Sequence, residues 1–225
     1  ITTYTVYNGI CHVEDGPNRK GNYLPEKTRD GRRVRPGNLP EIMPGPEDTY
    51  QEYGKPWAGA SNTPFRLYKH FVHEGGISSP LIANWPAGID TQGEFRRQPA
   101  HLIDVMATCV ELSGAEYPAT RDGRPVHPAE GVSLLPAFAD QPLDREAIYG
   151  EHEGKRAVRS GRWKLVAKGP RGPWELYDLA ADRTETADLA DEYPDRVRDM
   201  AQRWLDWAER SHVLPWPHRG GPGPQ

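Results

Sequence analysis

A stretch rich in proline and glycine near the start of the chain limits where regular structure can form. Residues 15–59 contain seven prolines and seven glycines in 45 positions, with no sustained helical or strand period. Proline removes a backbone hydrogen-bond donor, and glycine weakens helices and strands alike. The composition therefore predicts a long loop at 15–59, of a length that in compact domains is usually functional or disordered.

Two regular elements are expected in the middle of the chain. A short apolar run at 79–85, bounded by turn residues, is typical of a buried strand. A helix is expected at 98–113, ending at a glycine cap, Gly114. Apolar residues recur on one face of this helix at Leu102, Val105, Met106, Cys109 and Leu112. We expect this face, including Cys109, to lie in the core.

From about residue 147 the pattern becomes that of an antiparallel sheet. Strands at 155–159 and 162–167 flank Ser160-Gly161, a two-residue hairpin signal, and another strand is expected at 174–179. A final helix is expected at 194–210, with a proline in its first turn. Its inner face would carry Val197, Met200, Trp204 and Trp207.

The principal candidate site residue, Lys69, is followed closely by the turn Glu74-Gly75-Gly76. Two adjacent glycines permit a sharp bend and a close approach of the main chain to a ligand. A lysine ammonium can hold an anionic ester and stabilise charge on a group being transferred. On spacing alone, an ordinary solvated lysine is the favoured interpretation. Of the neighbouring histidines, His73 is a better candidate than His70 because it borders the glycine turn.

Residues 62–76 and the run that follows them to residue 88 resemble the lysine-bearing segment of the arylsulfatases, in the alkaline-phosphatase-like superfamily. The resemblance covers nearly everything from residue 46 to residue 216. Further matching motifs follow in the same order at 101–109, 151–154, 157–159, 163–165 and 174–179. It implies an α/β chain with a partial alkaline-phosphatase-like (sulfatase) fold, ending in a small antiparallel sheet plus helix.

The resemblance also implies a domain division. Residues 1–140 would be the C-terminal part of the catalytic α/β domain, and 141–213 a small C-terminal α+β subdomain. Residues 214–225, rich in proline and glycine, are expected to be a disordered tail. In the family the lysine segment lies well downstream of the catalytic cysteine, whereas 68 residues precede Lys69 here. The chain is therefore expected to be the C-terminal portion only.

The function implied by the resemblance is hydrolysis of a sulfuric ester, from a small molecule or a glycan. Lys69 would hold the sulfate group, and His73 and His152 would help to bind the substrate. His152 lies between Glu151 and Glu153, a pattern that is also typical of a solvated hairpin edge. Two alternatives stay open: a phosphonate or phosphate ester hydrolase of the same superfamily, and a non-catalytic remnant or interaction domain.

The family nucleophile has no counterpart in this sequence. It is a formylglycine made from the cysteine of a Cys-x-Pro-x-Arg motif, and neither Cys11 nor Cys109 has proline or arginine at the required positions. The chain is therefore expected to be inactive alone.

The family's divalent cation, usually calcium, is held by Asp and Asn side chains, since such ions prefer hard oxygen ligands. Asn8 resembles one of these ligands, but the partner aspartate position is Tyr7. The expected metal site is thus incomplete. Either it has diverged, or residues 1–7 do not belong to the sulfatase sequence.

Charge and hydropathy restrict the partners. A net charge of −4 without a long basic run argues against nucleic acid. No apolar stretch is long enough to span a bilayer, and no signal-peptide pattern is present. Because the chain is expected to lack its N-terminal half, these observations do not decide its cellular compartment.

Overall fold

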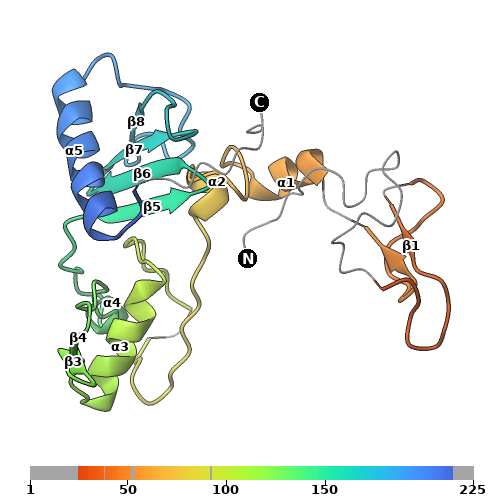
Figure 1. The fold of residues 1–225 in the computed structure, drawn as a ribbon, viewed down its shortest axis with the longest axis horizontal. Coiled ribbons are helices and arrows are strands. Elements are labelled where there is room, and N and C mark those ends of the chain that lie inside the picture. The colour runs from red at the N-terminus through yellow and green to blue at the C-terminus, as the bar shows by residue number, and fades with distance from the viewer. Residues whose placement is uncertain (1–24, 38, 52–53, 92, 215–225) are drawn as a thin grey trace. The chain divides into compact units, whose positions relative to one another are not determined.

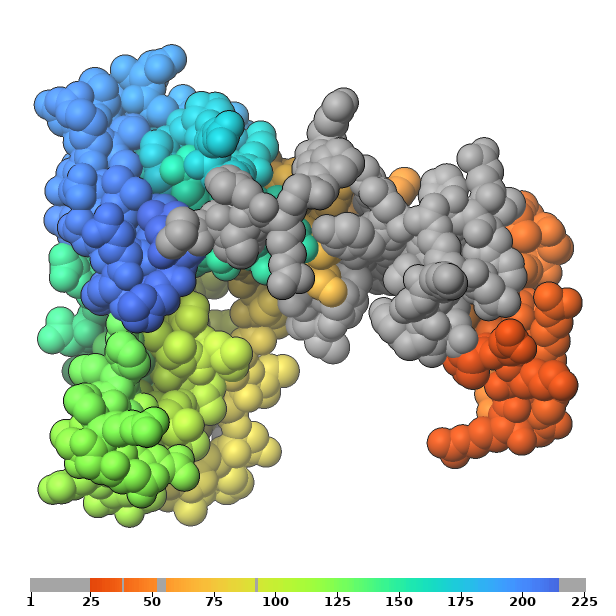
Figure 2. All heavy atoms as spheres, in the orientation of Figure 1, coloured from red at the N-terminus to blue at the C-terminus, as the bar shows by residue number. Residues whose placement is uncertain are grey.

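A computed structural model describes residues 25–214 except 38, 52–53 and 92, which together with the two ends are grey in Figures 1 and 2. The expectations for Asn8, for residues 1–7 and for nearly all of the tail at 214–225 lie outside these residues. The chain divides into two compact units, one formed by Ile1–Pro80 with Tyr149–Gln225, the other by Leu81–Ile148. The expected domain boundary after residue 140 remains a prediction.

Within the predicted loop at 15–59, the described residues contain little regular structure. Strands β1 (Arg35–Pro36) and β2 (Thr49–Tyr50) form a short parallel pair. Helix α1 (Gly54–Asn62) begins inside the predicted loop, and the four-residue helix α2 (Glu74–Ile77) follows. Pro56 does not prevent α1, because the backbone N–H groups of a first helical turn have no intrahelical acceptor.

The C-terminal sheet has the strand order β5 (Ile148–His152), β6 (Lys155–Ser160), β7 (Trp163–Ala167) and β8 (Glu175–Asp178). The β6–β7 and β7–β8 pairs are antiparallel, as expected. The β6–β7 turn is displaced by one position, since Ser160 pairs with Trp163 and leaves Gly161-Arg162 as the turn. Gly161, with a φ of 55°, takes the conformation that favours glycine.

Helix α5 (Pro194–Arg210) covers one face of this sheet (Figure 1). Its buried residues Met200, Trp204 and Ala208 lie on one side of the helix. The Trp204 indole N–H donates to the Gly150 carbonyl at 3.1 Å, which satisfies its polar atom within the core. The predicted helix bounds are confirmed, and so is most of the predicted inner face.

The opposite face of the sheet is covered by the segment that carries Lys69. Side chains alternate along a strand, so Lys164 and Val166 of β7 point away from Leu165 and Ala167. Val166 lies in a buried apolar cluster with Val72, Ala157, Tyr177 and Leu179. Because Val72 comes from the lysine-bearing segment, this cluster joins that segment to the sheet.

The second unit contains helix α3 (Ile103–Ser113), the hairpin β3 (Thr120–Arg121) with β4 (Arg124–Pro125), and helix α4 (Leu135–Phe138). Gly114 caps α3 as predicted, with a φ of 66°. The predicted strand at 79–85 is wrong. Pro80 removes one backbone donor from the run, Pro86 follows directly after it, and no described strand pairs with it.

The predicted inner face of α3 is also wrong. Leu102 is 83% and Met106 59% exposed, and Cys109 is exposed as well. The buried residues are Asp104 and Thr108, on the other side of the helix. Asp104 accepts a hydrogen bond from the Val132 N–H at 3.1 Å and pairs with Arg145, while the Thr108 hydroxyl accepts from the Leu134 N–H at 2.9 Å. Within this unit, polar contacts therefore decide which face is covered.

Candidate functional site

The loop that carries Lys69 is held at both ends by one side chain. The Asn62 amide, at the end of α1, donates to the carbonyls of Leu67 and Gly75, both at 2.8 Å. Leu67 and His70 adopt the left-handed region, with φ values of 65° and 81°. Such conformations persist in non-glycine residues only where the surroundings fix them. Lys69 itself is half-buried.

The two glycines of α2 lie directly against this loop. A Cβ on Gly75 would be 2.2 Å from the Arg66 carbonyl oxygen, and a Cβ on Gly76 would be 2.0 Å from the Phe71 carbonyl oxygen. Neither distance leaves space for a side chain. The expected close approach is thus found, but the main chain approaches the lysine-bearing loop itself. Both glycines have ordinary helical geometry, so the missing side chain is what matters.

Glu175 of β8 ties the loop to the sheet. Its Oε2 accepts hydrogen bonds from the Tyr177 hydroxyl at 2.6 Å, from Arg66 at 2.7 Å and from His73 Nε2 at 3.2 Å, and Lys168 Nζ lies 3.0 Å from Oε1. Burial alone would raise the pKa of Glu175. The hydrogen bonds from His73, Tyr177 and Lys168 outweigh burial and hold this pKa well below its usual range.

A buried ion-pair group joins α2 to β7. Lys164 Nζ lies 2.9 Å from Glu74 Oε1 and 2.7 Å from Glu185 Oε1, and Glu185 Oε2 accepts the Glu74 backbone N–H at 2.8 Å. All three side chains are at most 4% exposed. Burial opposes ionisation of Glu74, but the attraction of Lys164 and its hydrogen bond lower the Glu74 pKa below the usual value. The charges are therefore paired where water cannot screen them.

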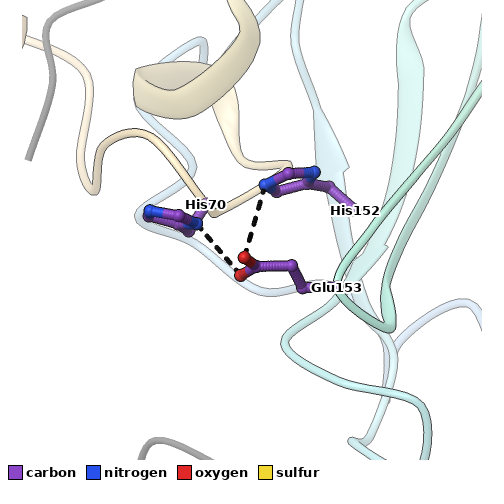
Figure 3. A group of neighbouring side chains, drawn as sticks. All are labelled: His70, His152 and Glu153. Atoms are coloured by element: carbon purple, nitrogen blue, oxygen red, sulfur yellow. Dashed lines mark hydrogen bonds and ion pairs between the residues drawn. The ribbon is translucent and has the colours of Figure 1, made fainter. Parts of the chain in front are cut away.

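A third group lies at the β5–β6 turn and includes His152 (Figure 3). The Glu153 carboxylate lies between two imidazoles, with His70 Nδ1 3.0 Å from Oε2 and His152 Nε2 3.9 Å from Oε1. The two rings are stacked, with centroids 5.5 Å apart. Lys155 Nζ lies 3.3 Å from Glu153 Oε2.

The predicted site residues are thus distributed over different surroundings. His152 and the neighbour of Lys69, His70, lie together. His73 is fully buried against Glu175, so its predicted contact with substrate stays a prediction. Arg66, Lys164 and Glu175 hold the loop but were not among the predicted site residues. One sequence signal could have revealed Lys164. It is a charged residue that strand alternation places on the same face as the apolar Val166.

The described residues do not fit the expected calcium site. Within the part of the chain that the structure describes, the grouping that could hold a metal ion is His70, His152 and Glu153. Two imidazole nitrogens and one carboxylate are a poor set for calcium, which prefers six or more oxygen ligands. No step through calcium is therefore assigned to these residues.

Among the described helices, none combines the length and apolar character needed to cross a membrane.

Comparisons with known proteins match the region that contains these groups. A family model described as "N-sulphoglucosamine sulphohydrolase, C-terminal" matches residues 65–208. An uncharacterized sulfatase of Schizosaccharomyces pombe is 31% identical over 175 residues, covering 73% of this chain and 31% of the yeast protein. The N-acetylgalactosamine-6-sulfatase of Canis lupus familiaris is 34% identical over 128 residues, covering 56% of this chain and 23% of the dog protein.

Among solved structures, the crystal structure of Ps i-CgsB aligns with a TM-score of 0.54 at 25% identity. The alignment covers 69% of this chain and 34% of that one. The chain thus spans about a third or less of the length of these three proteins.

Proposed function

This chain belongs to the sulfatase family, whose C-terminal portion it matches, and on this premise we propose that it supplies the sulfate-binding lysine, Lys69, of a sulfuric ester hydrolase. Its helices and small antiparallel sheet form part of the alkaline-phosphatase-like fold of that family. Hydrolysis of sulfate esters is the activity of the family. The assignment of roles to single residues below is our proposal.

The observation that supports the role of Lys69 is the way its loop is held. Two buried groups, around Glu175 and around Lys164, fix the segment on both sides of Lys69 to one sheet. A flexible surface lysine does not need such supports. A group that stabilises charge in a transition state does, because its contribution depends on being positioned before the reaction.

Lys69 would hold the anionic sulfate oxygens as a compact positive charge. We assign His73 a positioning role, since its buried side chain connects the loop to Glu175. His152, whose side chain is 51% exposed, would contact the alcohol part of the ester, from a small molecule or a glycan. The formylglycine nucleophile would come from sequence outside this chain, since neither cysteine lies in a Cys-x-Pro-x-Arg motif.

The test joins the full chain to the upstream part of a sulfatase relative that carries the Cys-x-Pro-x-Arg motif. The fusion is expected to hydrolyse an aryl sulfate, and Lys69→Ala is expected to lower kcat/KM by roughly 100- to 1,000-fold, the usual cost of losing a charge-stabilising donor. Lys27→Ala, at an exposed lysine, is the control and should change nothing.

Two outcomes would overturn the proposal. An active fusion that is indifferent to Lys69→Ala would remove the assigned role. Faster turnover of the matching aryl phosphate or phosphonate would favour the alternative ester class. As a measurement on the chain alone, titration with inorganic sulfate should show binding that Lys69→Ala abolishes.

A further inference from the structure

We propose that His70, His152 and Glu153 form a binding site for a divalent transition-metal ion of the zinc class. The three side chains come from two separate parts of the chain, the lysine-bearing loop and the β5–β6 turn. Their ligand atoms all lie within 4.8 Å of one another. The inference concerns metal binding and does not depend on the assignment of Lys69 to sulfate. It makes His152 a metal ligand, which would replace the direct contact with the ester proposed above for this residue.

The donor set determines the class of metal. Zinc accepts imidazole nitrogen and carboxylate oxygen at about 2.0–2.2 Å, and two histidines with one glutamate are a recurring three-ligand set. Ligand atoms bound tetrahedrally at such lengths are roughly 3.3 Å apart. The distances are 3.0 Å from Glu153 Oε2 to His70 Nδ1 and 3.9 Å from Glu153 Oε1 to His152 Nε2, which lie on either side of this separation.

The backbone holds the ligands in place before a metal arrives. Glu153 and Gly154 form a two-residue turn in which both φ values are positive, 53° and 80°, as a type I′ hairpin turn requires. The Glu151 carboxylate accepts the Gly154 N–H at 2.6 Å and closes this turn. On the other side, His70 belongs to the loop that Asn62 fixes at both ends. Figure 3 shows both rings directing a nitrogen at the carboxylate.

The surroundings of His70 and Glu153 favour the forms that bind a cation. Burial lowers the pKa of His70, and repulsion from His152 and Lys69 adds to this, while the nearby Glu153 carboxylate acts in the opposite direction. A neutral imidazole has one nitrogen with a lone pair, and a metal at His70 Nδ1 would take the place of the proton that this nitrogen shares with Glu153. The pKa of Glu153 is also low: burial opposes ionisation, but Lys155 and His70 outweigh it. Lys155 and Lys69 are nearby positive charges that would repel a bound cation.

A metal at this position would have a further consequence for ligands. Three protein ligands leave a tetrahedral ion one position for water or an oxygen anion.

The experiment is calorimetric titration of the full chain with Zn²⁺ at pH 7.5, with Co²⁺ absorption as a spectroscopic readout of nitrogen and oxygen coordination. We expect one ion per chain. His152→Ala should weaken binding by at least about 10-fold, since even the residues that support metal ligands typically contribute 10–100-fold. His127→Ala, at an exposed histidine of the other unit, is the matched control and should bind like the unaltered chain.

A second variant guards against loss of folding. His70→Asn keeps a residue that tolerates the left-handed backbone and should also weaken binding, with an unchanged melting temperature in the absence of metal. Binding should weaken as the pH falls and the imidazoles become protonated. Absence of binding at millimolar Zn²⁺, or equal affinity in the His152→Ala and His127→Ala variants, would overturn the proposal. Displacement of Zn²⁺ by equimolar Ca²⁺ would overturn the assigned metal class.

Discussion

Two consecutive residues without side chains decide how closely α2 can approach the lysine-bearing loop. At Gly75 and Gly76 even one added carbon would lie within 2.2 Å of a backbone carbonyl oxygen of that loop. Backbone atoms cannot rotate away as a flexible side chain can. Each position therefore requires glycine because a side chain would not fit, and not because of its φ angle. The sequence alone could not distinguish this reason from the need for glycine in a turn.

We predict that Gly76→Ala lowers the free energy of unfolding by about 3 kcal/mol, the upper part of the usual range for overpacking. Urea denaturation measures this directly. Gly59→Ala is the control, because Gly59 lies in α1 with nothing within 4 Å of its added Cβ. That change should be neutral or stabilise the helix by up to about 1 kcal/mol. Equal effects of the two substitutions would contradict the steric argument.

Lys164 carries a second prediction at this scale. It is the shared ion-pair partner of Glu74 and Glu185 in a fully buried position, so Lys164→Met would take that cation from Glu185 and leave Glu74 with the more distant Arg183 at 3.7 Å. Breaking a buried pair in this way typically costs about 3–5 kcal/mol. The double variant Lys164→Met with Glu185→Gln should recover part of the loss, because one uncompensated charge is removed. A loss below about 1 kcal/mol in the single variant would show that water reaches the group.

At the level of elements, local sequence was sufficient to predict the bounds of an element where one of its faces is apolar and its packing partner is near in the chain. Helix α5 has its predicted bounds, and the three predicted strands correspond to β6, β7 and β8, with one turn displaced. The orientation of α3 was not predictable from periodicity. Its covering contacts come from Val132, Leu134 and Arg145, far along the chain, and they select Asp104 and Thr108.

The site was predictable only in part for a similar reason. Local motifs indicate Lys69 and His152 as candidates, and their roles stay predictions. The supports around them join residues about 90 to 110 positions apart, such as Glu74 with Lys164 and Arg66 with Glu175. Charge alone does not reveal such pairs. They depend on which strand face is covered, and by which segment.

The contact between the lysine-bearing segment and β8 predicts a pH dependence. The pKa of Glu175 is lower in the folded chain than the value near 4.3 expected for an unfolded glutamate. Its contribution to stability is therefore present above about pH 4.3 and is lost as the pH falls toward the folded pKa. Urea denaturation between pH 7 and pH 2.5 should show a falling free energy of unfolding.

Glu175→Gln should be less stable at pH 7 by on the order of 2 kcal/mol, the usual contribution of hydrogen bonds to a charged group. It should also lose less stability than the unaltered chain on acidification. Glu116→Gln, which removes a carboxylate at an exposed position outside this network, serves as the control. Parallel pH profiles for the unaltered chain and Glu175→Gln would contradict the assigned contribution.

At the scale of the whole molecule, one unit carries an apolar surface that the described chain leaves uncovered. The exposed residues lie along α3 and next to it: Leu102, Ile103, Val105, Met106 and Leu112. Contiguous apolar surface of this kind favours association or binding of apolar molecules. It also means that these residues contribute little to the stability of the unit itself.

We predict that Met106→Lys changes the free energy of unfolding by less than about 0.5 kcal/mol, as for most exposed positions. The same change should reduce the binding of a fluorescent apolar dye to the native chain. Thr108→Val, at a buried position on the other side of α3, should instead destabilise the chain, because the Leu134 N–H would lose its acceptor. Strong destabilisation by Met106→Lys would show that this face is covered in solution.

The lysine-bearing segment and the sheet that it covers belong to one unit, although the whole of Leu81–Ile148 intervenes between them in the chain. Peptide continuity is therefore not what keeps Lys69 in place. If a protease nicked the backbone within the exposed stretch around Ile82, the two pieces should remain associated and migrate together until a denaturant separates them. During synthesis on the ribosome the same arrangement imposes an order, because the two groups that support the Lys69 loop are complete only after Glu175 and Glu185 have emerged.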